Sequence, residues 1–471
     1  RPDVLDKALL RAGRFDGQMT DDAAAFSSSI EFDKRLFEAD IKCNRAHTTM
    51  LTEEGIIPEE AGKKILKALD KLEEEGLEAL DLNPSFEDIH MALEDYVTKE
   101  IGKEAGFMHT GKSRNDQVCT DVRITLKEEI ENTVANIKSF IQTIVDIAKE
   151  NTDTLFIAYT HLQHAQPTTF AHHLMAYANE LRRDCERFMD TYKRVDMNPL
   201  GSAALTTTGF PINRQRTTEL LGFSKAMDNS IDGVSSRDFA AETIFDYAML
   251  STTLGKISEE IVIWSTYEFR MVECSNQYSS TSIMPQKKNP DIAELARGKS
   301  TIAYGELMTV LSMIKGIPHS YNRDLQEVSP HVWNAIDNTN DILGIVHGML
   351  STLTINKERT EELAGANFAT ATELADVMVR EKNLPFRTAH QIVGRIVSDA
   401  IAENISVNEI DNDYVNRVSV EITGEKLDLG EELVRQALDP LLNVKSRTVK
   451  GGCAPEAVIE SIEIMESFLN E

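Results

Sequence analysis

A thirteen-residue stretch, residues 279–291, combines the side chains that anion binding and proton transfer require; it reads SSTSIMPQKKNPD. Hydroxyl groups lie at its start, and Lys287 follows Thr281 by six residues. A solvated loop is the plainer interpretation, because Ser, Asn and Pro are common turn formers. Ile283 and Met284 argue against it, since a fully solvated loop has no use for large apolar side chains. We therefore predict a functional loop that captures an anion beside a proton-transfer group.

A second group with chemical potential is a cluster of histidines. Four of the eleven histidines lie within thirteen residues, at His161, His164, His172 and His173. Zinc binding is one interpretation, because histidine is a common zinc ligand. Pro167 interrupts the segment, so the four cannot share one helix face, and no cysteine or further acidic ligand joins them. We predict no metal site here, and both a structural and a proton-transfer histidine stay open.

Motifs along the chain resemble those of one enzyme family. The loop sequence STSIMPQKKNPD resembles the mobile loop of the fumarase/aspartase superfamily, and its QKKNPD form is similar to that of the argininosuccinate lyase family. Five other stretches agree with the family in chain order: HTGKSRNDQ (109–117), YTHLQHAQP (159–167), DGVSSRD (232–238), YNRDLQE (321–327) and ATATELAD (369–376). The resemblance runs from about residue 11 to the C-terminal region. It implies a lyase that cleaves argininosuccinate to arginine and fumarate without a cofactor.

The chemistry of that reaction shows which side chains are needed. A proton leaves a carbon beside a carboxylate, so the developing negative charge needs fixed positive charge and hydrogen-bond donors. The leaving nitrogen must be protonated by a positioned acid. The resemblance implies that His161 transfers a proton with Glu294 as its partner, because a carboxylate on one imidazole nitrogen fixes its tautomer and raises its basicity. It also implies that Lys287 holds a substrate carboxylate and that a hydroxyl of the loop, Thr281 or Ser282, is the base.

The same resemblance implies a wider set of substrate-binding residues. It implies contacts from Ser29, Asn115, Thr160, Tyr321 and Gln326, with Asp33, Asp88 and His90 in support. The needs of an anion site add Ser113, Arg114 and Asn289 as donors, and Arg323 is a candidate for further positive charge. Amides and cations in this set suit a dicarboxylate, whereas Asp33 suits a guanidinium group, since carboxylate–guanidinium pairs can be bidentate. Without the resemblance, His90 fits a capping or core histidine, and Tyr321 and Gln326 fit ordinary loop residues.

Two places depart from the family pattern. Family members usually carry a lysine where this chain has Ser329, so either Arg323 supplies that charge or the distal end of the substrate is held differently. In the loop, Thr281 stands where the family usually has a serine base, and Ser280 replaces the preceding glycine. Threonine keeps the hydroxyl but is stiffer at χ1. Ser282 is the neighbouring candidate.

Long amphipathic helices must position these residues. Apolar residues recur every three or four positions from Val122 to Ala148, which predicts one helix over about 115–150, roughly 54 Å long. Similar stripes predict helices over residues 169–193, 235–268, 291–316 and 329–355. Because period-two alternation is almost absent, we predict an all-α fold with a central long-helix bundle. Such lengths exceed the needs of one compact domain, so we expect neighbouring subunits to bury the stripes, as the family's homotetramers with shared active sites imply.

Breaks in the pattern predict three domains. We expect an N-terminal helical domain at residues 1–111, the central bundle at 112–362 and a small C-terminal helical domain at 363–471. Residues 1–10 are an extension to which we assign no function. Residues 198–213, rich in Gly, Pro, Ser and Thr, predict a long loop.

Composition limits the partners. The net charge of −28 argues against nucleic acid and anionic membranes, because phosphate binding needs a basic surface. Five widely spaced cysteines without a C-x-x-C motif indicate reduced thiols. The sequence contains no apolar run long enough to span a membrane. We expect a cytoplasmic protein whose partner is a small-molecule substrate.

Three functions stay open. The QKKN and RNDQ forms favour argininosuccinate cleavage over another fumarate-releasing reaction such as that of adenylosuccinate lyase. The same family supplies lens crystallins, so a non-catalytic structural protein of this fold is the third alternative. The presence of His161, Lys287 and Asn289 argues against lost activity.

Overall fold

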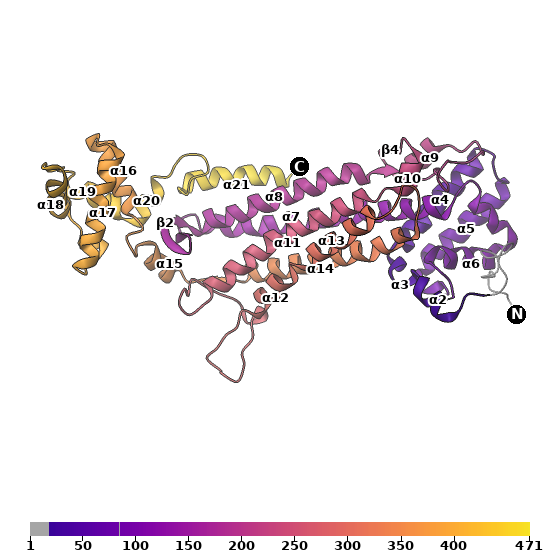
Figure 1. Cartoon of the computed structure of the whole chain (residues 1–471), viewed down its shortest axis with the longest axis horizontal. Helices are drawn as coiled ribbons and strands as arrows, with labels where there is room; N and C mark the ends of the chain where they lie inside the picture. Colours follow the sequence, from indigo (N-terminus) through magenta and orange to yellow (C-terminus); the bar gives the residue numbers. More distant parts are fainter. Residues whose placement is uncertain (1–17, 84) are drawn as a thin grey trace. The chain divides into compact units, whose positions relative to one another are not determined.

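The computed structural model describes residues 18–83 and 85–471, and helices dominate this part of the chain (Figure 1). Residues 1–10, to which no function was assigned, lie outside the described residues. The helices of the N-terminal region are α2 (Asp21–Ser27), α3 (Ile30–Asp33), α4 (Phe37–Glu53), α5 (Glu59–Glu75) and α6 (Ile89–Ile101). The predicted all-α class is confirmed. No helix among the described residues is long and apolar enough to cross a membrane.

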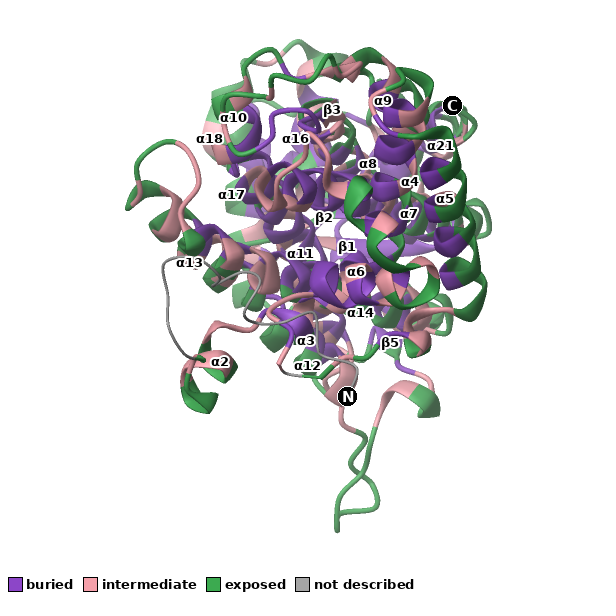
Figure 2. Cartoon of the chain, turned by 90° about the vertical axis from the view of Figure 1, so that its right-hand side faces the viewer, coloured by how far each residue is buried: buried purple, intermediate pink, exposed green. Residues whose placement is uncertain are grey.

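Four long helices follow the predicted stripes closely. They are α7 (Arg114–Lys149), α8 (Phe170–Val195), α11 (Asp238–Trp264) and α14 (Val328–Ser351). On α7 the stripe from Val122 to Ala148 is buried as expected, except that Val134 is half-buried and Thr133 takes its inward place. Figure 2 shows buried residues concentrated along these helices.

The remaining helices are shorter. Between the long ones lie α9 (Arg214–Leu221), α10 (Ser230–Ser235), α12 (Asp291–Lys299) and α13 (Ile302–Lys315). The C-terminal ones are α15 (Lys357–Ala364), α16 (Ala371–Lys382), α17 (Phe386–Ala402), α18 (Asn412–Thr423), α19 (Glu431–Leu438), α20 (Pro440–Lys445) and α21 (Pro455–Leu469). Short 3-10 helices are η1 (Lys34–Leu36), η2 (Leu77–Ala79), η3 (Gly102–His109), η4 (Asn276–Tyr278), η5 (Arg323–Glu327) and η6 (Val407–Glu409).

The structure differs from the sequence-based expectations in one predicted helix and in one hairpin that was not predicted. The single helix expected over 291–316 was wrong in one respect, because it breaks between Lys299 and Ile302. The Ser300 hydroxyl there donates to the Arg297 carbonyl at 2.5 Å, offering the backbone an alternative to the helical bond. The sequence also did not reveal a hairpin of β1 (Leu155–Thr160) and β2 (Gln163–Thr169). The other strands have two residues each: β3 (Met197–Asn198), β4 (Lys225–Ala226), β5 (Val272–Glu273) and β6 (Thr354–Ile355).

The described chain divides into two compact units. Unit 1 contains the residues up to Ala135, Glu186–Ser251 and Thr301–Asn340, and unit 2 contains Asn136–Cys185, Thr252–Ser300 and Asp341–Glu471. The long helices contribute one segment to each unit. The expected domain limits after residues 111 and 362 stay predictions.

Polar contacts as well as apolar packing join the helices within unit 1. Tyr247 on α11 and Thr133 on α7 share a buried hydrogen bond of 2.6 Å, and Asn340 on α14 donates to the same Thr133 hydroxyl at 3.1 Å. Phe188 on α8 packs edge-on against Tyr247, with ring centroids 4.7 Å apart. Such satisfied polar groups set the register of neighbouring helices, because an unpaired buried hydroxyl is costly.

Unit 2 has its own contacts. Thr253 on α11 donates to Asp184 on α8 at 2.7 Å, and Thr143 on α7 lies 2.7 Å from His347 on α14. A separate apolar core joins α16, α17, α18 and α19, with Met378, Ile392 and Val415 fully buried. This core explains why the C-terminal helices are short, since each turns back onto the same small cluster.

Candidate functional site

Two helix starts bring opposite charges together in unit 1. Asp88 is the N-cap of α6, where its carboxylate accepts a hydrogen bond from the Met91 amide at 2.8 Å. Its other oxygen pairs with Arg114 Nε at 3.0 Å, and Arg114 is the first residue of α7. One carboxylate thus orients the guanidinium of the predicted anion-binding arginine.

A buried carboxylate lies close to this pair. Ser29 donates its hydroxyl to Asp33 at 2.5 Å, and the Ser29 amide donates to the Glu87 carbonyl at 2.8 Å. Burial raises the pKa of Asp33 to about 6, although the neighbouring His90 charge opposes that rise. A desolvated carboxylate of this kind gains most from a cationic ligand that enters beside it. The geometry suits the guanidinium role expected for Asp33.

The segment before and within η5 reaches the same region. Arg323 Nη2 donates to the Ser27 carbonyl at 2.8 Å, and Gln326 Nε2 donates to the same oxygen at 3.1 Å. Arg323 Nε also donates to Gln326 Oε1 at 3.2 Å. Tyr321 is half-buried, and burial raises the pKa of its phenol despite the nearby charges of Arg237 and Arg323. Unit 1 therefore places Arg323 and Gln326 against the end of α2, two residues before Ser29.

The first turn of α7 presents hydrogen-bond donors. The Ser113 amide donates to Asp116 at 2.9 Å, and Asn115 Nδ2 donates to the Ala204 carbonyl at 3.1 Å. The second oxygen of Asp116 accepts the amides of Gly201 and Ala203 at 3.0 and 2.8 Å. Burial raises the pKa of Asp116 to about 6 against these hydrogen bonds. Asp116, which sequence reasoning did not select, ties the predicted long loop to the anion-binding turn.

His161 occupies the tip of the hairpin in unit 2. Thr160 and Gln163 are the last paired residues, so His161 and Leu162 form a two-residue turn. Both have φ of 55°, a left-handed conformation that such turns demand and that usually falls to Asn or Gly. The side chains of Thr160, His161 and Leu162 are exposed. Backbone strain at a predicted proton-transfer residue is typical of functional sites.

The lysine-bearing loop extends from a β-bridge between Ser280 and Asn289. Their backbones exchange hydrogen bonds of 3.1 and 2.7 Å, and the Ser280 hydroxyl bonds to Asp291. Lys288 pairs with Glu273 at 2.9 Å. Residues 281–288 are all exposed, and they form the green loop that projects before α12 in Figure 2.

The predicted proton-transfer pair is not formed in the single chain. Glu294 lies in the first turn of α12 with an exposed side chain. Among the described residues, the side chains of His161, Lys287 and Glu294 make no hydrogen bond or ion pair. Unit 1 thus brings most of the predicted substrate-binding residues together, whereas the predicted catalytic residues of unit 2 are exposed, and Thr281 and Ser282 bond only within their own loop.

The other clustered histidines have structural partners. His172 Nδ1 lies 2.8 Å from the Thr168 hydroxyl and its Nε2 lies 3.0 Å from the Gly451 carbonyl. His173 pairs with Glu260 at 2.8 Å. Within the described part of the chain, the group with metal-like spacing is instead Asp40, His90 and Asp121. Sequence reasoning missed Asp40 and Asp121, although a carboxylate at an inward position of an apolar helix was a usable signal.

Fold and site together define a long-helix lyase of the fumarase/aspartase superfamily, with a hydroxyl- and lysine-bearing loop. Residues 13–305 match the family model described as Lyase, and residues 368–445 match the one described as argininosuccinate lyase C-terminal. This chain belongs to the argininosuccinate lyase family. It is 87% identical to the argininosuccinate lyase of Methanosphaera stadtmanae over 98% of this chain and 100% of that protein. It is 59% identical to the one from Methanothermobacter thermautotrophicus over 98% of each.

Solved structures agree with this placement. An EDDS lyase in complex with formate is 34% identical, with a TM-score of 0.85 over 98% of this chain and 92% of that one. A class II fumarase from Schistosoma mansoni shares the fold, with a TM-score of 0.71 at 13% identity over 87% and 90% of the two chains.

Proposed function

We propose that this chain cleaves argininosuccinate by β-elimination to L-arginine and fumarate, as a step of arginine biosynthesis. The observation that carries the proposal is the 87% identity to an argininosuccinate lyase across the whole of that protein. The unit 1 cluster supports it, because a buried carboxylate and an oriented arginine suit a substrate with a guanidinium at one end and carboxylates at the other.

Substrate binding is divided between the two ends of the molecule to be cleaved. Asp33, held by Ser29, pairs with the guanidinium, and Tyr321, Arg323 and Gln326 hold the rest of the arginine half. Asp88 and His90 support this site from α6.

The fumarate half is bound by cations and amides. The Arg114 guanidinium donates two hydrogen bonds to one substrate carboxylate, and Ser113 and Asn115 donate further hydrogen bonds to the same carboxylate. Lys287 and Asn289 of the loop hold the carboxylate next to the carbon that loses its proton. Charge that develops on that carboxylate is stabilised by groups already in place, which is the main source of catalysis in such eliminations.

Two groups move protons. A loop hydroxyl, Thr281 or Ser282, removes the proton from carbon, and Lys287 stabilises the alkoxide this requires. His161, oriented by Glu294 and assisted by Thr160, moves the proton on the nitrogen side. No metal or organic cofactor enters the sequence of steps.

The exposed state of His161, Lys287 and Glu294 in one chain supports a shared site. We propose a cytoplasmic homotetramer in which neighbouring subunits bring these three residues to each unit 1 cluster. Exposed apolar side chains on α13, among them Met308 and Leu311, support an assembly that buries helix faces.

Fumarate release tests the function. Purified protein mixed with argininosuccinate should produce fumarate and arginine in equal amounts, followed by ultraviolet absorbance and amino-acid analysis. EDTA should leave the rate unchanged, because no step uses a metal. Adenylosuccinate and the substrate of the EDDS lyase are the controls, since related enzymes act on other fumarate-releasing substrates.

Three other outcomes of this experiment would each contradict part of the proposal. Faster release from adenylosuccinate would replace the proposed substrate. Loss of activity in EDTA that zinc restores would contradict the metal-free mechanism. A folded protein that acts on none of these substrates would favour a crystallin-like structural role.

A further inference from the structure

Five side chains from three helices of unit 1 form a ring at the start of α6 and α7, in which the backbone supplies the link between Asp88 and His90. Arg114 Nε pairs with Asp88 at 3.0 Å, and its Nη1 donates to Gln117 Oε1 at 2.9 Å. Gln117 Nε2 donates to Asp40 Oδ1 at 2.8 Å. The same Asp40 oxygen pairs with His90 Nδ1 at 2.8 Å, and His90 follows Asp88 on α6. Asp40 is therefore linked to the proposed anion-binding arginine on one side and to His90 on the other.

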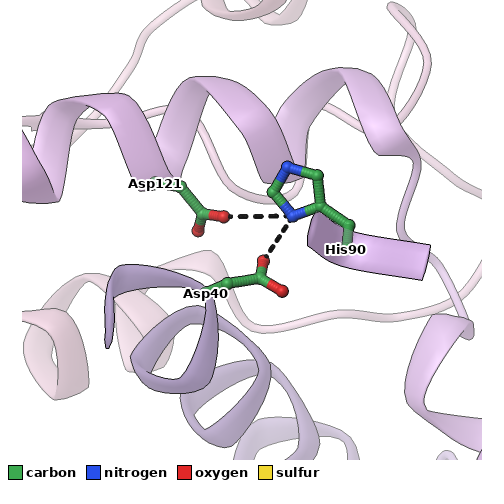
Figure 3. Close-up of side chains that lie close together, drawn as sticks. All are labelled: Asp40, His90 and Asp121. Atoms are coloured by element: carbon green, nitrogen blue, oxygen red, sulfur yellow. Dashed lines mark hydrogen bonds and ion pairs between the residues drawn. The ribbon is translucent and has the colours of Figure 1, made fainter. Parts of the chain in front are cut away.

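Three members of the ring are buried, and Asp88 and Arg114 are half-buried. Asp40 is 0% exposed, and Gln117 and His90 are 1% exposed. Burial alone would raise the pKa of Asp40, but the charges of His90 and Lys112 and the hydrogen bonds hold it well below its usual value. Asp121, 3.4 Å from His90 Nδ1, faces the same nitrogen (Figure 3). Burial and the charge of Asp40 raise the pKa of Asp121 well above its usual value.

His90 is the group through which the charge of Asp40 affects the pKa of Asp33. Burial would lower the pKa of His90, yet the carboxylates of Asp40 and Asp88 raise it despite the nearby Arg114. The imidazole Nε2 points away from the carboxylates of Asp40 and Asp121, which face Nδ1 (Figure 3), and it is buried with no hydrogen-bond partner among the described residues. The charge of His90 lowers the pKa of Asp33, whereas the charge of Asp88 raises the pKa of Asp33.

A bound cation is the alternative explanation of this cluster. The ligand atoms of Asp40, His90 and Asp121 lie within 4.8 Å of one another. However, Lys112 already places a positive charge beside both carboxylates. The Gln117 amide also donates to the Asp40 oxygen that faces the imidazole. Donors on the ligand atoms and a fixed cation nearby favour a hydrogen-bonded network over a metal site.

We propose that Asp40 is a positioning residue for the lyase reaction: through Gln117 it fixes Arg114, and through its bond to His90 it fixes the imidazole in the first turn of α6. Gln117 is the second positioning residue. The inference rests on the proposed function, because it assigns a purpose to residues behind the proposed substrate site. It predicts that two substitutions in the same ring have different kinetic signatures.

The first substitution is Asp40→Asn, which keeps the shape and removes the charge. His90 then loses the carboxylate that raises the pKa of its imidazole most, so that pKa falls, although Asp88 still opposes the fall. Less positive charge beside Asp33 lets the pKa of Asp33 rise. The acid limb of kcat/KM for argininosuccinate should shift to higher pH by on the order of one unit.

The second substitution is Gln117→Leu, which removes the link to Arg114 and leaves Asp40 paired with His90. KM for argininosuccinate should rise about tenfold, the effect of a mispositioned charged donor, while kcat changes less. The acid limb should stay where it is in the wild type. If Asp40→Asn fails to fold, the KM of the Gln117→Leu variant still tests the proposal.

Asp246→Asn is the matched control. Asp246 is 3% exposed in unit 1 and hydrogen-bonds Thr191, outside the ring. Its substitution should leave both KM and the pH profile unchanged. If Asp40→Asn lowers thermal stability but leaves the pH profile of kcat/KM as in the wild type, Asp40 is purely structural and the proposal is overturned. Activation of the EDTA-treated enzyme by a divalent metal would overturn it as well. Calorimetric binding of fumarate to the Gln117→Leu variant separates this proposal from the reaction itself, because weakened binding needs no turnover.

Discussion

Two neighbouring hydroxyls, those of Thr281 and Ser282, are the candidates for the base in the loop. Its hydroxyl donates to the Met284 carbonyl at 3.1 Å, whereas the Ser282 oxygen lies 3.4 Å from the Met284 amide. The Thr281 hydroxyl must leave this carbonyl and lose its proton before it can accept a proton from the substrate, because a hydrogen bond donated by the neutral form disfavours the alkoxide. The Ser282 oxygen faces the turn, where it orders the loop.

Thr281→Val tests this assignment, because valine keeps the β-branched shape and removes only the oxygen. If Thr281 is the base, kcat should fall by about two orders of magnitude or more, on the scale of general-base catalysis, while substrate binding persists. Thr281→Ser should retain most activity, and Ser282→Ala should be mild. The reverse pattern in steady-state kinetics, an active Thr281→Val and an inactive Ser282→Ala, would assign the base to Ser282.

The hairpin β1–β2 is the element that presents His161, and its turn is strained. Leu162 has φ of 55° and is 63% exposed, although leucine is poorly suited to the left-handed region. Asparagine tolerates that region because its short polar side chain can hydrogen-bond locally.

Leu162→Asn should therefore stabilise the free chain by roughly 1 kcal/mol and leave His161 in place. Thermal unfolding should show a higher midpoint, with kcat within about twofold of the wild type. Leu162→Val should act oppositely, since a branched side chain is less tolerated at positive φ. A lower midpoint for Leu162→Asn would mean that the leucine is buried against another subunit.

At the scale of the whole molecule, the proposed active site is completed by assembly. Light scattering should give a mass near four times 52.6 kDa. His161→Asn in unit 2 and Asp33→Asn in unit 1 should each be inactive. Co-expression should restore activity, to about a quarter of the wild type by random pairing, because some shared sites then receive two intact halves. A monodisperse monomer with full activity would contradict the tetramer and the shared site together.

Much of the fold follows from local patterns. The stripe on α7 and the limits of α8 and α11 were predictable, because burial of one helix face imposes a period that survives in the sequence. The hairpin was not, since its strands are short and its turn, His161–Leu162, lacks the usual Asn-Gly. The break at Ser300 depends on a single hydroxyl and leaves no mark on the apolar period.

The sequence by itself determined the helical class, the family and the identity of the chemical groups, because apolar periodicity and motif residues are properties of the chain's order. Only the tertiary structure decided which of these groups meet. Asp33, Asp88 and Arg114 are separated by 55 and 26 positions but lie in one region, where Asp88 pairs with Arg114 and burial raises the pKa of Asp33. Asp40 and Asp121 lie in no motif, and Gln117 ends the 109–117 motif without an assigned role. Their contacts became visible only in the fold, because a buried polar group is defined by what surrounds it.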